Sequence, residues 1–421
     1  MKILWLCNVL LPKISEQIGE RRNNLGGWLS GLSDALVQDS ELQLFYMCPS
    51  AVKKSVEGTA DRIHYVVFPA SNPLEYNSDL EAFFTACIQK IQPDIIHIFG
   101  TEFPHTLAMV NASEKCGMLD QTVISIQGLV SVYADHYCDG LPEPLLHGFS
   151  LRSAVKGNAI LKGQNFYYKR GEFEIDALRK CRNVIGRTAW DKEETLKINP
   201  DIHYWFCGET LRSCFYQDQW NWDHCKKHSI FVSQLSYPIK GFHMLMQILP
   251  QLMEEYPDLQ ISVTGNDVFH PTLQQKIRED PYLRYIRKYV ARNHLNDHIA
   301  FKGDLDDVSM KREYLNANVF VCPSTIENSS NSIGEAIMLG TPAVVSAVGG
   351  IPTIMKGIDN ALIYPFSDQE LMLKYVRGAF SEQIKMERIS SEERKKARVL
   401  YDAQINNDTL FQIYLKLERK H

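Results

Sequence analysis

The segment 318–342 constrains the fold of this chain more than any other. It begins with an apolar run rich in β-branched and aromatic residues, 319–322, which ends at Pro323. A polar turn follows, and then a short helical pattern that is closed by Gly340 and Pro342. These patterns predict a buried strand, a loop and the start of a helix, in that order.

Two glutamates give this segment its chemical character. Glu327 falls in the predicted loop and Glu335 in the first helical turn, on either side of 330–332, whose backbone N–H groups would open the helix. A helix N-terminus attracts anions, and nearby carboxylates favour hydroxyl or ammonium partners. The combination indicates a ligand with both phosphate and many hydroxyl groups, such as a nucleotide sugar. For Glu335 a second interpretation stays open, because Ser332 and Glu335 have the spacing of a capping box.

Length and charge limit the possibilities further. With 421 residues and 45% hydrophobic content, the chain is long enough for two domains with separate cores. Its net charge of -5 and pI near 6.2 give no basic footprint, so nucleic acid is not an expected partner. No apolar run approaches the roughly 20 residues that span a bilayer. The first residues are typical of a buried strand rather than a signal sequence.

Neither the cysteines nor the aspartates predict a metal site. Ten cysteines are spread along the chain without Cys-x-x-Cys or zinc-like Cys/His spacing, which is typical of reduced thiols in a cytoplasmic protein. Asp304 and Asp306 have a spacing that can hold Mg²⁺ or Mn²⁺, but the helical pattern after them favours helix caps. We therefore expect no metal, no cofactor and a cytoplasmic location.

Strand and helix patterns alternate along both halves of the chain. Such alternation predicts an α/β fold with parallel, doubly wound sheets, whose ligands gather beyond the carboxyl ends of the strands. His97, His105, Gln127 and Arg187 lie on or just after such ends, and for each histidine a role in the core is the alternative. The expected strands of the first half are 3–7, 42–47, 63–68, 93–100, 122–126 and 183–186.

A pair of glycines, Gly26 and Gly27, stands at the entry to a predicted helix with leucines at helical spacing. Glycine there lets backbone amides approach a phosphate closely. The dinucleotide-binding pattern G-x-G-x-x-G fails because Trp28 occupies its middle glycine position. The alternative for this segment is a flexible turn.

The expected boundary between the halves falls in 207–227, which is polar and aromatic without a periodic pattern. A second α/β pattern follows, and the end of the chain is helical only. We therefore predict an N-terminal domain, 1–215, completed by a C-terminal helix, 402–421, and a C-terminal domain, 216–401. The expected strands of the second half are 229–234, 259–264, 299–303, 319–322 and 343–347.

One stretch, 144–171, is basic and aromatic although the chain as a whole is acidic. It contains no Asp or Glu, which suggests contact with an anionic lipid surface or with a phosphate-bearing acceptor. The alternative is an ordinary solvated helical face. Its cationic residues are Arg152, Lys156, Lys162, Lys169 and Arg170.

The second half resembles the retaining glycosyltransferases of family 4, often called glycosyl transferases group 1. The resemblance is strongest over 229–352, and the E-x7-E arrangement of Glu327 and Glu335 in a strand-loop-helix setting is its most specific part. Weaker support comes from the first half. The motifs that carry the resemblance are Pro238-Ile-Lys240, Val263-Thr-Gly265, Phe301-Lys-Gly303, 323–336, Gly340-Thr-Pro342 and 348–352, with Gly26-Gly27-Trp28, 93–97 and 186–191 in the first half.

The resemblance implies a GT-B architecture, in which two Rossmann-like domains face a cleft and a C-terminal helix crosses back to the N-terminal domain. The C-terminal domain would hold a nucleoside-diphosphate sugar, UDP- or GDP-linked, without an essential metal. Lys240 matches the lysine that meets the diphosphate. Glu335 matches the carboxylate that grips the ribose hydroxyls, and Glu327 matches the one beside the donor sugar.

The same resemblance implies that backbone amides near Asn331, Ser332 and Ile333, together with Gly26 and Gly27, cradle the phosphates. The implied reaction is retaining transfer of the sugar to a hydroxyl of a glycan or lipid-linked acceptor. Cell-surface polysaccharide synthesis, in the cytoplasm and with peripheral contact at the inner face of the membrane, is the expected setting.

Two positions depart from the family pattern. Gln234 stands where many members have the diphosphate arginine, so we place Gln234 with Lys240 and Glu327 in the catalytic set and consider Arg187 as a substitute cation. Gln127 stands where many members have a histidine, which leaves His105 and Gln127 as acceptor-side candidates. These departures keep open a sugar-nucleotide-binding accessory subunit with little activity of its own, and sugar-nucleotide epimerisation is a third hypothesis.

Overall fold

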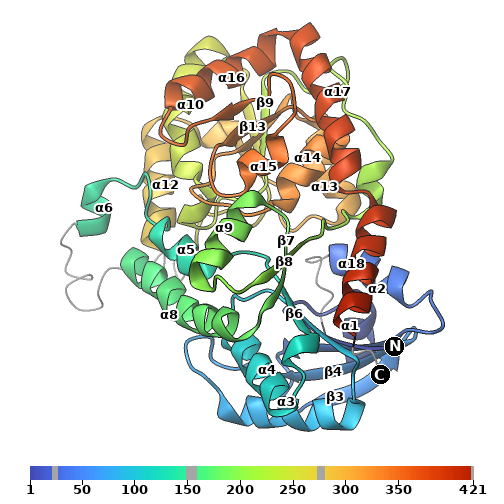
Figure 1. Cartoon of the computed structure of the whole chain (residues 1–421). Helices are drawn as coiled ribbons and strands as arrows, with labels where there is room; N and C mark the ends of the chain where they lie inside the picture. Colours follow the sequence, from blue (N-terminus) through green and yellow to red (C-terminus); the bar gives the residue numbers. More distant parts are fainter. Residues whose placement is uncertain (21–26, 148–158, 273–279, 419–421) are drawn as a thin grey trace. The chain divides into compact units, whose positions relative to one another are not determined.

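The computed structural model describes residues 1–20, 27–147, 159–272 and 280–418 (Figure 1). The chain divides into two compact units, each of which is described by itself below. Unit 1 comprises Met1–Ala134, Phe166–Arg212 and Tyr401–His421, and unit 2 comprises Asp135–Asn165 and Ser213–Leu400.

The segment 135–165 groups with unit 2, whereas the sequence prediction placed it in the N-terminal domain. Two hydrogen bonds show how it is attached. His243 Nε2 bonds to the carbonyl of Asp139 at 2.8 Å, and Thr325 Oγ1 donates to the carbonyl of His136 at 2.8 Å. Long-range contacts of this kind leave no periodic signal in the sequence.

The described strands of unit 1 form one sheet in the order β3-β4-β2-β1-β5-β6-β7-β8. All neighbouring pairs are parallel except β3 with β4. Strands β5, β6 and β7 are buried along their whole length, as expected for a parallel sheet covered on both faces. The bounds are β1 Lys2–Leu6, β2 Gln43–Ser50, β3 Val56–Ala60, β4 Ile63–Pro69, β5 Ile95–Phe99, β6 Thr122–Ser125, β7 Asn183–Gly186 and β8 His203–Phe206.

Helices connect and cover these strands. Helix α8 begins in unit 2 and ends in unit 1, so it carries the chain from one unit to the other. The helices are α1 Pro12–Ile18, α2 Gly27–Leu36, α3 Ser78–Ile91, α4 Pro104–Lys115, η1 Leu119–Gln121, α5 Val130–Asp135, α8 Ala159–Lys180, α9 Ala189–Ile198 and α18 Ala403–Leu417.

The described strands of unit 2 form a second sheet, in the order β11-β10-β9-β12-β13-β14, with parallel pairing throughout. Its strands are β9 Ser229–Val232, β10 Gln260–Val263, β11 Ile299–Phe301, β12 Val319–Cys322, β13 Ala343–Ser346 and β14 Ile363–Tyr364. Its helices are α6 Glu143–His147, η2 Ser213–Tyr216, η3 Pro238–Lys240, α10 Phe242–Glu255, α12 Pro281–Arg292, η4 Asn296–His298, α13 Asp307–Asn316, α14 Asn331–Leu339, α15 Ile351–Met355, α16 Gln369–Ser381 and α17 Gln383–Leu400.

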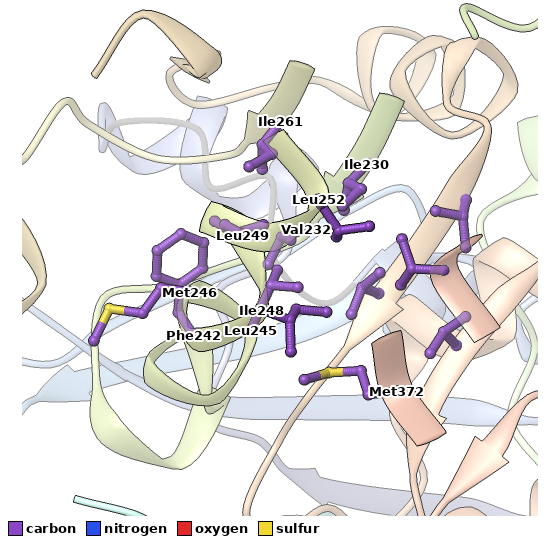
Figure 2. Packing of buried hydrophobic residues seen from close by; sticks show 14 of the residues in the cluster. Ile230, Val232, Phe242, Leu245, Met246, Ile248, Leu249, Leu252, Ile261 and Met372 are labelled. Atoms are coloured by element: carbon purple, nitrogen blue, oxygen red, sulfur yellow. The ribbon is translucent and has the colours of Figure 1, made fainter. Parts of the chain in front are cut away.

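One apolar side of α10 packs into the core of unit 2. Leu245, Leu249 and Leu252 recur at helical spacing, are fully buried, and share a core cluster with Ile230 and Val232 of β9 (Figure 2). Truncating a leucine in such a position to alanine typically costs roughly 2–5 kcal/mol. This core therefore fixes β9, from whose carboxyl end one of the site loops departs.

Each sheet reverses its strand order once. In unit 1 the chain goes outward from β1 through β2 and later crosses to β5 on the other side of β1; in unit 2 it goes from β9 through β10 and β11 and later crosses to β12. Loops that leave the two strands at a reversal diverge, and ligands of open α/β sheets bind between them. The topology therefore indicates one candidate site after β1 and β5 and another after β9 and β12.

The expected α/β fold class is confirmed, including the return of the C-terminal helix α18 to unit 1. Asp306 accepts a hydrogen bond from the backbone N–H of Ser309 at 2.8 Å, which confirms its interpretation as a helix cap. In the described part of the chain, no helix combines the length and the apolar character needed to cross a bilayer. The sequence patterns missed β3, β8, β14 and α1.

Helix α18 is attached to the sheet through a buried hydroxyl. Tyr414 Oη accepts a hydrogen bond from Trp5 Nε1 at 3.0 Å and lies 2.6 Å from His97 Nδ1. His97 Nε2 lies 2.7 Å from Ser125 Oγ, and burial lowers the pKa of His97 to about 3, so the ring is neutral at pH 7. The chain of hydrogen bonds thus assigns His97 to the core of unit 1.

We expect Tyr414→Phe to destabilise unit 1 by about 1–3 kcal/mol, because Trp5 Nε1 and His97 Nδ1 would be buried without a partner. Hydrogen exchange of peptides from β1 and β5 measures this change locally. The control is Tyr65→Phe on β4, since no hydrogen bond of the Tyr65 hydroxyl occurs within the described residues. Equal exchange in the two variants would contradict the assignment.

Candidate active site

Two loops meet at the strand reversal of unit 2. The loop after β9 leads through η3 to Lys240, and the loop after β12 leads to Glu327. The backbone N–H of Thr325 donates to the carbonyl of Ile239 at 2.8 Å, which joins the loops. Gly241 has a φ of +66°, and a Cβ there would lie 1.8 Å from the carbonyl oxygen of Pro323. Only glycine permits this close approach.

A charged pair lies where the loops meet. Lys240 Nζ donates to Glu327 Oε1 at 2.6 Å, and Ser324 Oγ donates to the same oxygen at 3.0 Å. The two charged side chains are 22% and 9% exposed. Burial lowers the pKa of Lys240, but the Glu327 carboxylate outweighs burial and holds this pKa well above its ordinary value. Lys240 is therefore a permanent cation beside a buried carboxylate.

A third loop holds Glu327 from the other side. The backbone N–H of Gly350 donates to the carbonyl of Glu327 at 2.9 Å. Gly349 has a φ of +51°, and a Cβ there would lie 2.0 Å from the same carbonyl oxygen. Gly349, between β13 and α15, is thus required by the backbone position of Glu327, and Lys240 and Ser324 hold the side chain of Glu327 before any ligand arrives.

Helix α14 begins next to this pair, with Ser330 as its N-cap and Asn331, Ser332 and Ile333 as its first turn. The first intrahelical hydrogen bond runs from Gly334 N–H to the carbonyl of Ser330, at 3.0 Å. The N–H groups of the first turn precede it, and such groups attract anions.

The capping-box interpretation of Ser332 and Glu335 is wrong. The N-cap is Ser330, whose side chain makes no cap hydrogen bond and instead lies 2.9 Å from Ser332 Oγ. Glu335 consequently lies in the second turn of α14, where it cannot be the third residue of a capping box. Glu335 is mostly buried, with 7% of the residue exposed, and a capping role does not explain why a glutamate occupies this buried position.

The structure places the remaining donor-side candidates as follows. Gln234 lies just after β9 in a partly buried position, at the same end of the sheet as Lys240. Gly27 is the first residue of α2 in unit 1, whereas Gly26 lies outside the described residues. The roles of these three residues stay predictions.

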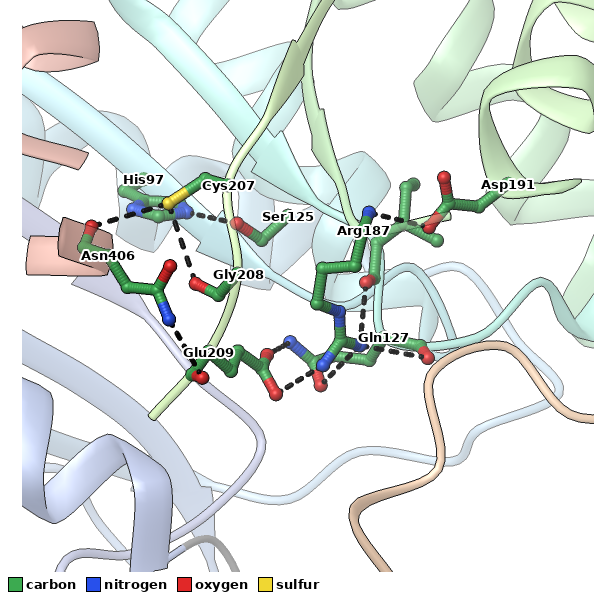
Figure 3. A network of polar contacts seen from close by, with 10 residues as sticks. His97, Ser125, Gln127, Arg187, Asp191, Cys207, Gly208, Glu209 and Asn406 are labelled. Atoms are coloured by element: carbon green, nitrogen blue, oxygen red, sulfur yellow. Dashed lines mark hydrogen bonds and ion pairs between the residues drawn. The ribbon is translucent and has the colours of Figure 1, made fainter. Parts of the chain in front are cut away.

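Arg187 and Gln127 meet in unit 1 through a glutamate that sequence reasoning did not single out (Figure 3). Arg187 Nη1 forms an ion pair with Glu209 Oε2, and Gln127 Nε2 donates to Glu209 Oε1 at 2.7 Å. Arg187 Nη2 also donates to the carbonyl of Ile126 at 3.1 Å. Burial raises the pKa of Glu209, while Arg187 and Gln127 oppose this shift. The Arg187 side chain is only 6% exposed, and the Glu209 carboxylate compensates its charge.

A small cavity of about 30 Å³ adjoins this network. Arg187, Glu209, His97 and Thr210 contribute to its wall, and Thr210 Oγ1 has no hydrogen-bond partner in the described structure. The wall is otherwise largely apolar, and a cavity of this size has room for about one ordered water beside these polar groups.

His105 lies at the strand reversal of unit 1. Its Nε2 is 2.5 Å from Asn8 Oδ1, and burial together with the nearby Arg170 lowers the pKa of His105 to about 4. No group of three or more His, Cys, Asp or Glu side chains in the described ranges has an arrangement suited to a metal ion. What the two reversals offer is therefore a lysine, a helix N-terminus and carboxylates in unit 2, and an imidazole with an amide in unit 1.

Comparison with known proteins agrees with this chemistry. Residues 215–396 match the family model described as glycosyl transferases group 1. Spore coat protein SA of Bacillus subtilis is 27% identical over 195 residues, 46% of this chain and 50% of that protein. A phosphatidylinositol N-acetylglucosaminyltransferase subunit of Homo sapiens is 28% identical over 239 residues, 56% of this chain and 42% of that protein. The matches thus span half or less of the length of these relatives.

Solved structures extend the likeness to the whole chain. Sucrose-phosphate synthase from Thermosynechococcus elongatus has a TM-score of 0.69 at 16% identity, covering 99% of both chains. Anabaena HepE in complex with UDP has a TM-score of 0.66 at 13% identity, covering 99% of this chain and 100% of that one. At such identities the likeness shows the fold, which is that of the GT-B glycosyltransferases. The match to the glycosyl transferases group 1 family model lies within residues 215–396, while the likeness in fold extends over the whole chain.

Proposed function

We propose that this protein is a retaining, metal-independent glycosyltransferase that moves a sugar from a nucleoside-diphosphate sugar to a hydroxyl of a glycan or lipid-linked acceptor. The observation that carries the proposal is the buried Lys240–Glu327 pair beside the N-terminus of α14, at the strand reversal of unit 2. UDP in the solved structure of HepE favours a uridine donor, and GDP is the alternative.

The chemistry requires positive charge at the leaving group. When the bond from the anomeric carbon to the diphosphate breaks, negative charge grows on the phosphate oxygens. Donors that are already in place stabilise this charge without reorganisation. Lys240 and the first-turn amides of α14 provide such donors. The acceptor hydroxyl would enter on the face of the leaving group, where a phosphate oxygen takes its proton, so the proposed reaction assigns no separate protein base.

The two glutamates are assigned to different parts of the donor, Glu327 to the sugar and Glu335 to the ribose. In this proposal Glu327 shares Lys240 with the incoming diphosphate and accepts hydrogen bonds from hydroxyls of the donor sugar. Glu335, in the second turn of α14, is assigned to the ribose hydroxyls. Carboxylates suit both tasks because a hydroxyl donates its strongest hydrogen bonds to a charged acceptor.

An accessory subunit that binds a sugar nucleotide without turnover is the second candidate. It is favoured by the neutral Gln234 in the loop after β9 and by the pairing of Arg187 with Glu209, which leaves no compensating arginine assigned to the diphosphate. Release of UDP or GDP from a panel of sugar nucleotides separates the two candidates, since tight binding without release supports the accessory subunit.

Lys240→Ala is expected to lower kcat/KM for nucleoside-diphosphate release by about 100-fold or more, because one preorganised donor to the developing charge is lost. Lys311→Ala is the matched control, since Lys311 also pairs with a carboxylate of unit 2, that of Asp218. Thermal melting of both variants accounts for the loss of a buried ion pair. An unchanged kcat/KM in a folded Lys240→Ala variant would refute the assignment.

The roles of Glu327 and Glu335 can be distinguished by measuring the binding of the nucleoside diphosphate alone. Glu335→Gln should weaken the binding of UDP or GDP by about tenfold, the effect of losing a charged hydrogen-bond acceptor for ribose. Glu327→Gln should leave diphosphate affinity unchanged or higher, because Lys240 loses its competing partner, while transfer of the sugar slows. Calorimetric titration measures both affinities, and the reverse pattern would exchange the two roles.

We place the reaction in the cytoplasm with peripheral contact at an anionic membrane, in keeping with relatives named for phosphatidylinositol substrates. Within the basic stretch, Arg152 and Lys156 lie outside the described residues. Arg170 is buried, with its guanidinium 4.4 Å from the centre of the Phe103 ring, so it cannot contribute. Lys162 and Lys169 are exposed, and Lys169 forms a surface ion pair with Glu172 at 3.2 Å.

Replacing Lys162 and Lys169 together by alanine should therefore reduce binding to vesicles that contain phosphatidylglycerol, since each such lysine contributes about 1 kcal/mol near an anionic surface. Co-sedimentation at low and high salt measures the effect. A double alanine variant of the exposed Lys374 and Lys395 in unit 2 is the control. Wild-type binding that ignores salt and anionic lipid would exclude this contact.

A further inference from the structure

Strand β8 forms an open edge of the sheet in unit 1. It pairs with β7 on one side and with no described strand on the other. Proteins usually protect such edges by keeping them short or by placing charges on them. The other described edge strands follow this rule, since β11 and β14 have 3 and 2 residues and β3 carries Glu57, which pairs with Lys90 at 2.7 Å. β8 has 4 residues, ends in three successive aromatic ones, and leaves Phe206 56% exposed.

The main chain of β8 has hydrogen-bonding groups that face the open side. The N–H of Cys207, directly after β8, donates to the carbonyl of Gly186 at 3.1 Å, so its main chain faces β7. Since main-chain groups alternate between the two sides of a strand, those of Tyr204 and Phe206 point away from β7. Within the described residues they make no hydrogen bond on that side. These two residues therefore offer donors and acceptors to another strand.

A groove of about 470 Å³ lies beside this edge, between β8 and α18. Its apolar wall includes Ile405, which is 56% exposed. An exposed apolar groove next to an unpaired strand edge is typical of a surface that another chain covers. The groove is lined by Trp205 and Phe206 from β8 and by Ile405, Thr409, Gln412 and Lys416 from α18.

Helix α18 runs alongside β8 in the opposite direction. Cys207 Sγ, just beyond the end of β8, donates to the carbonyl of Asn406, near the start of α18, at 3.5 Å. Lys416 Nζ, near the end of α18, lies 5.1 Å from the centre of the Trp205 ring. The middle of α18 therefore lies beside the middle of β8.

The exposed side of α18 is complementary to itself. Asp408 precedes Gln412 by four residues and Lys416 follows it by four, and all three residues are exposed. Two such helices that meet in antiparallel orientation at Gln412 bring Asp408 of each beside Lys416 of the other. Opposite charges that face each other in this way favour one arrangement of two chains over others.

The strand edge has the same symmetry, with its centre at Trp205. When two β8 strands pair in antiparallel orientation, Tyr204 of each lies opposite Phe206 of the other, and each such pair exchanges both of its N–H···O bonds. Because the middles of α18 and β8 lie side by side, a single two-fold axis serves the helices and the strands. A strand of unrelated sequence would satisfy the main chain without matching the charges of α18.

We propose that β8 and α18 form the interface of a two-fold symmetric dimer of this chain. The sheets of the two copies join at β8, and Asp408 of each copy pairs with Lys416 of the other. Symmetric dimers that use the same patch on both subunits are the commonest oligomers. This interface removes the open edge and covers Phe206. It does not depend on the proposed transferase function.

Sedimentation velocity of the full chain over about 1–100 μM tests the dimer, because this range covers weak and moderately tight association. We expect the wild type to approach the mass of a dimer. Asp408→Lys and Lys416→Asp should each weaken association by about tenfold or more, since each brings like charges together on both sides of the axis. The double variant exchanges the charges within each copy, so it should restore association.

Phe206→Glu tests the strand edge independently of the helix. A charge beside the pairing main chain opposes the joining of two strands, so this variant should be monomeric. Val56→Glu is the matched control, because Val56 is 37% exposed on β3, the edge strand at the other end of the same sheet. Melting temperatures show whether the variants are folded. If Lys416→Asp is not, because Lys416 packs on Trp205, then Asp408→Lys and Phe206→Glu decide the matter.

Three results would overturn this interface. The first is a wild type that stays monomeric at the highest concentration. The second is association of the folded Asp408→Lys or Phe206→Glu variant with wild-type strength. The third is a folded double variant that associates no better than Asp408→Lys alone, which would exclude the pairing of Asp408 with Lys416. Restored association in the double variant, together with wild-type behaviour of Val56→Glu, would support it.

Discussion

Parallel strands impose the constraint from which both sites follow. Since every strand of a parallel sheet points the same way, all the loops that follow the strands reach one edge, and only at a strand reversal do neighbouring loops diverge. Each unit has one such reversal, between β1 and β5 and between β9 and β12. At one lies the pair Lys240 and Glu327, and at the other Asn8 and His105, whose side chains hydrogen-bond to each other. The topology thus explains why polar groups far apart in sequence come together.

The mostly buried charge of Lys240 determines how the side chains of the candidate site in unit 2 are paired. A mostly buried lysine requires a partner, and Glu327 at 2.6 Å provides it in the ligand-free protein. A diphosphate would bring a second negative group to the same lysine and weaken its hold on Glu327, which would then be able to accept hydrogen bonds from the donor sugar. The ion pair therefore keeps both side chains in position in the ligand-free protein, and binding of the proposed donor would redistribute their hydrogen bonds.

Local patterns predicted most of the fold, and long-range contacts account for what they missed. Buried strands such as β5 and β12 consist almost entirely of apolar residues, so they were visible in the sequence. The strand β8 is half exposed and lacks such a run, and the segment 135–165 joins unit 2 through contacts with residues over 100 positions away. The predicted capping box was wrong because α14 begins two residues earlier than expected, with Ser330 rather than Ser332 as its N-cap. Boundaries of this kind depend on packing as much as on sequence.

The roles of single residues were harder to predict than helices and strands, because the role of a charged side chain depends on the group with which it pairs. Arg187 looked like a substitute for the arginine missing at Gln234, but Glu209, 22 residues later, compensates its charge within unit 1. Glu327 and Glu335 were found because one short segment holds both. With Arg187 paired to Glu209 and a neutral amide at Gln234, the proposed function leaves the stabilisation of the diphosphate to Lys240 and the first-turn amides of α14. Substituting Lys240 should therefore be costly in this chain, since less positive charge remains to replace it.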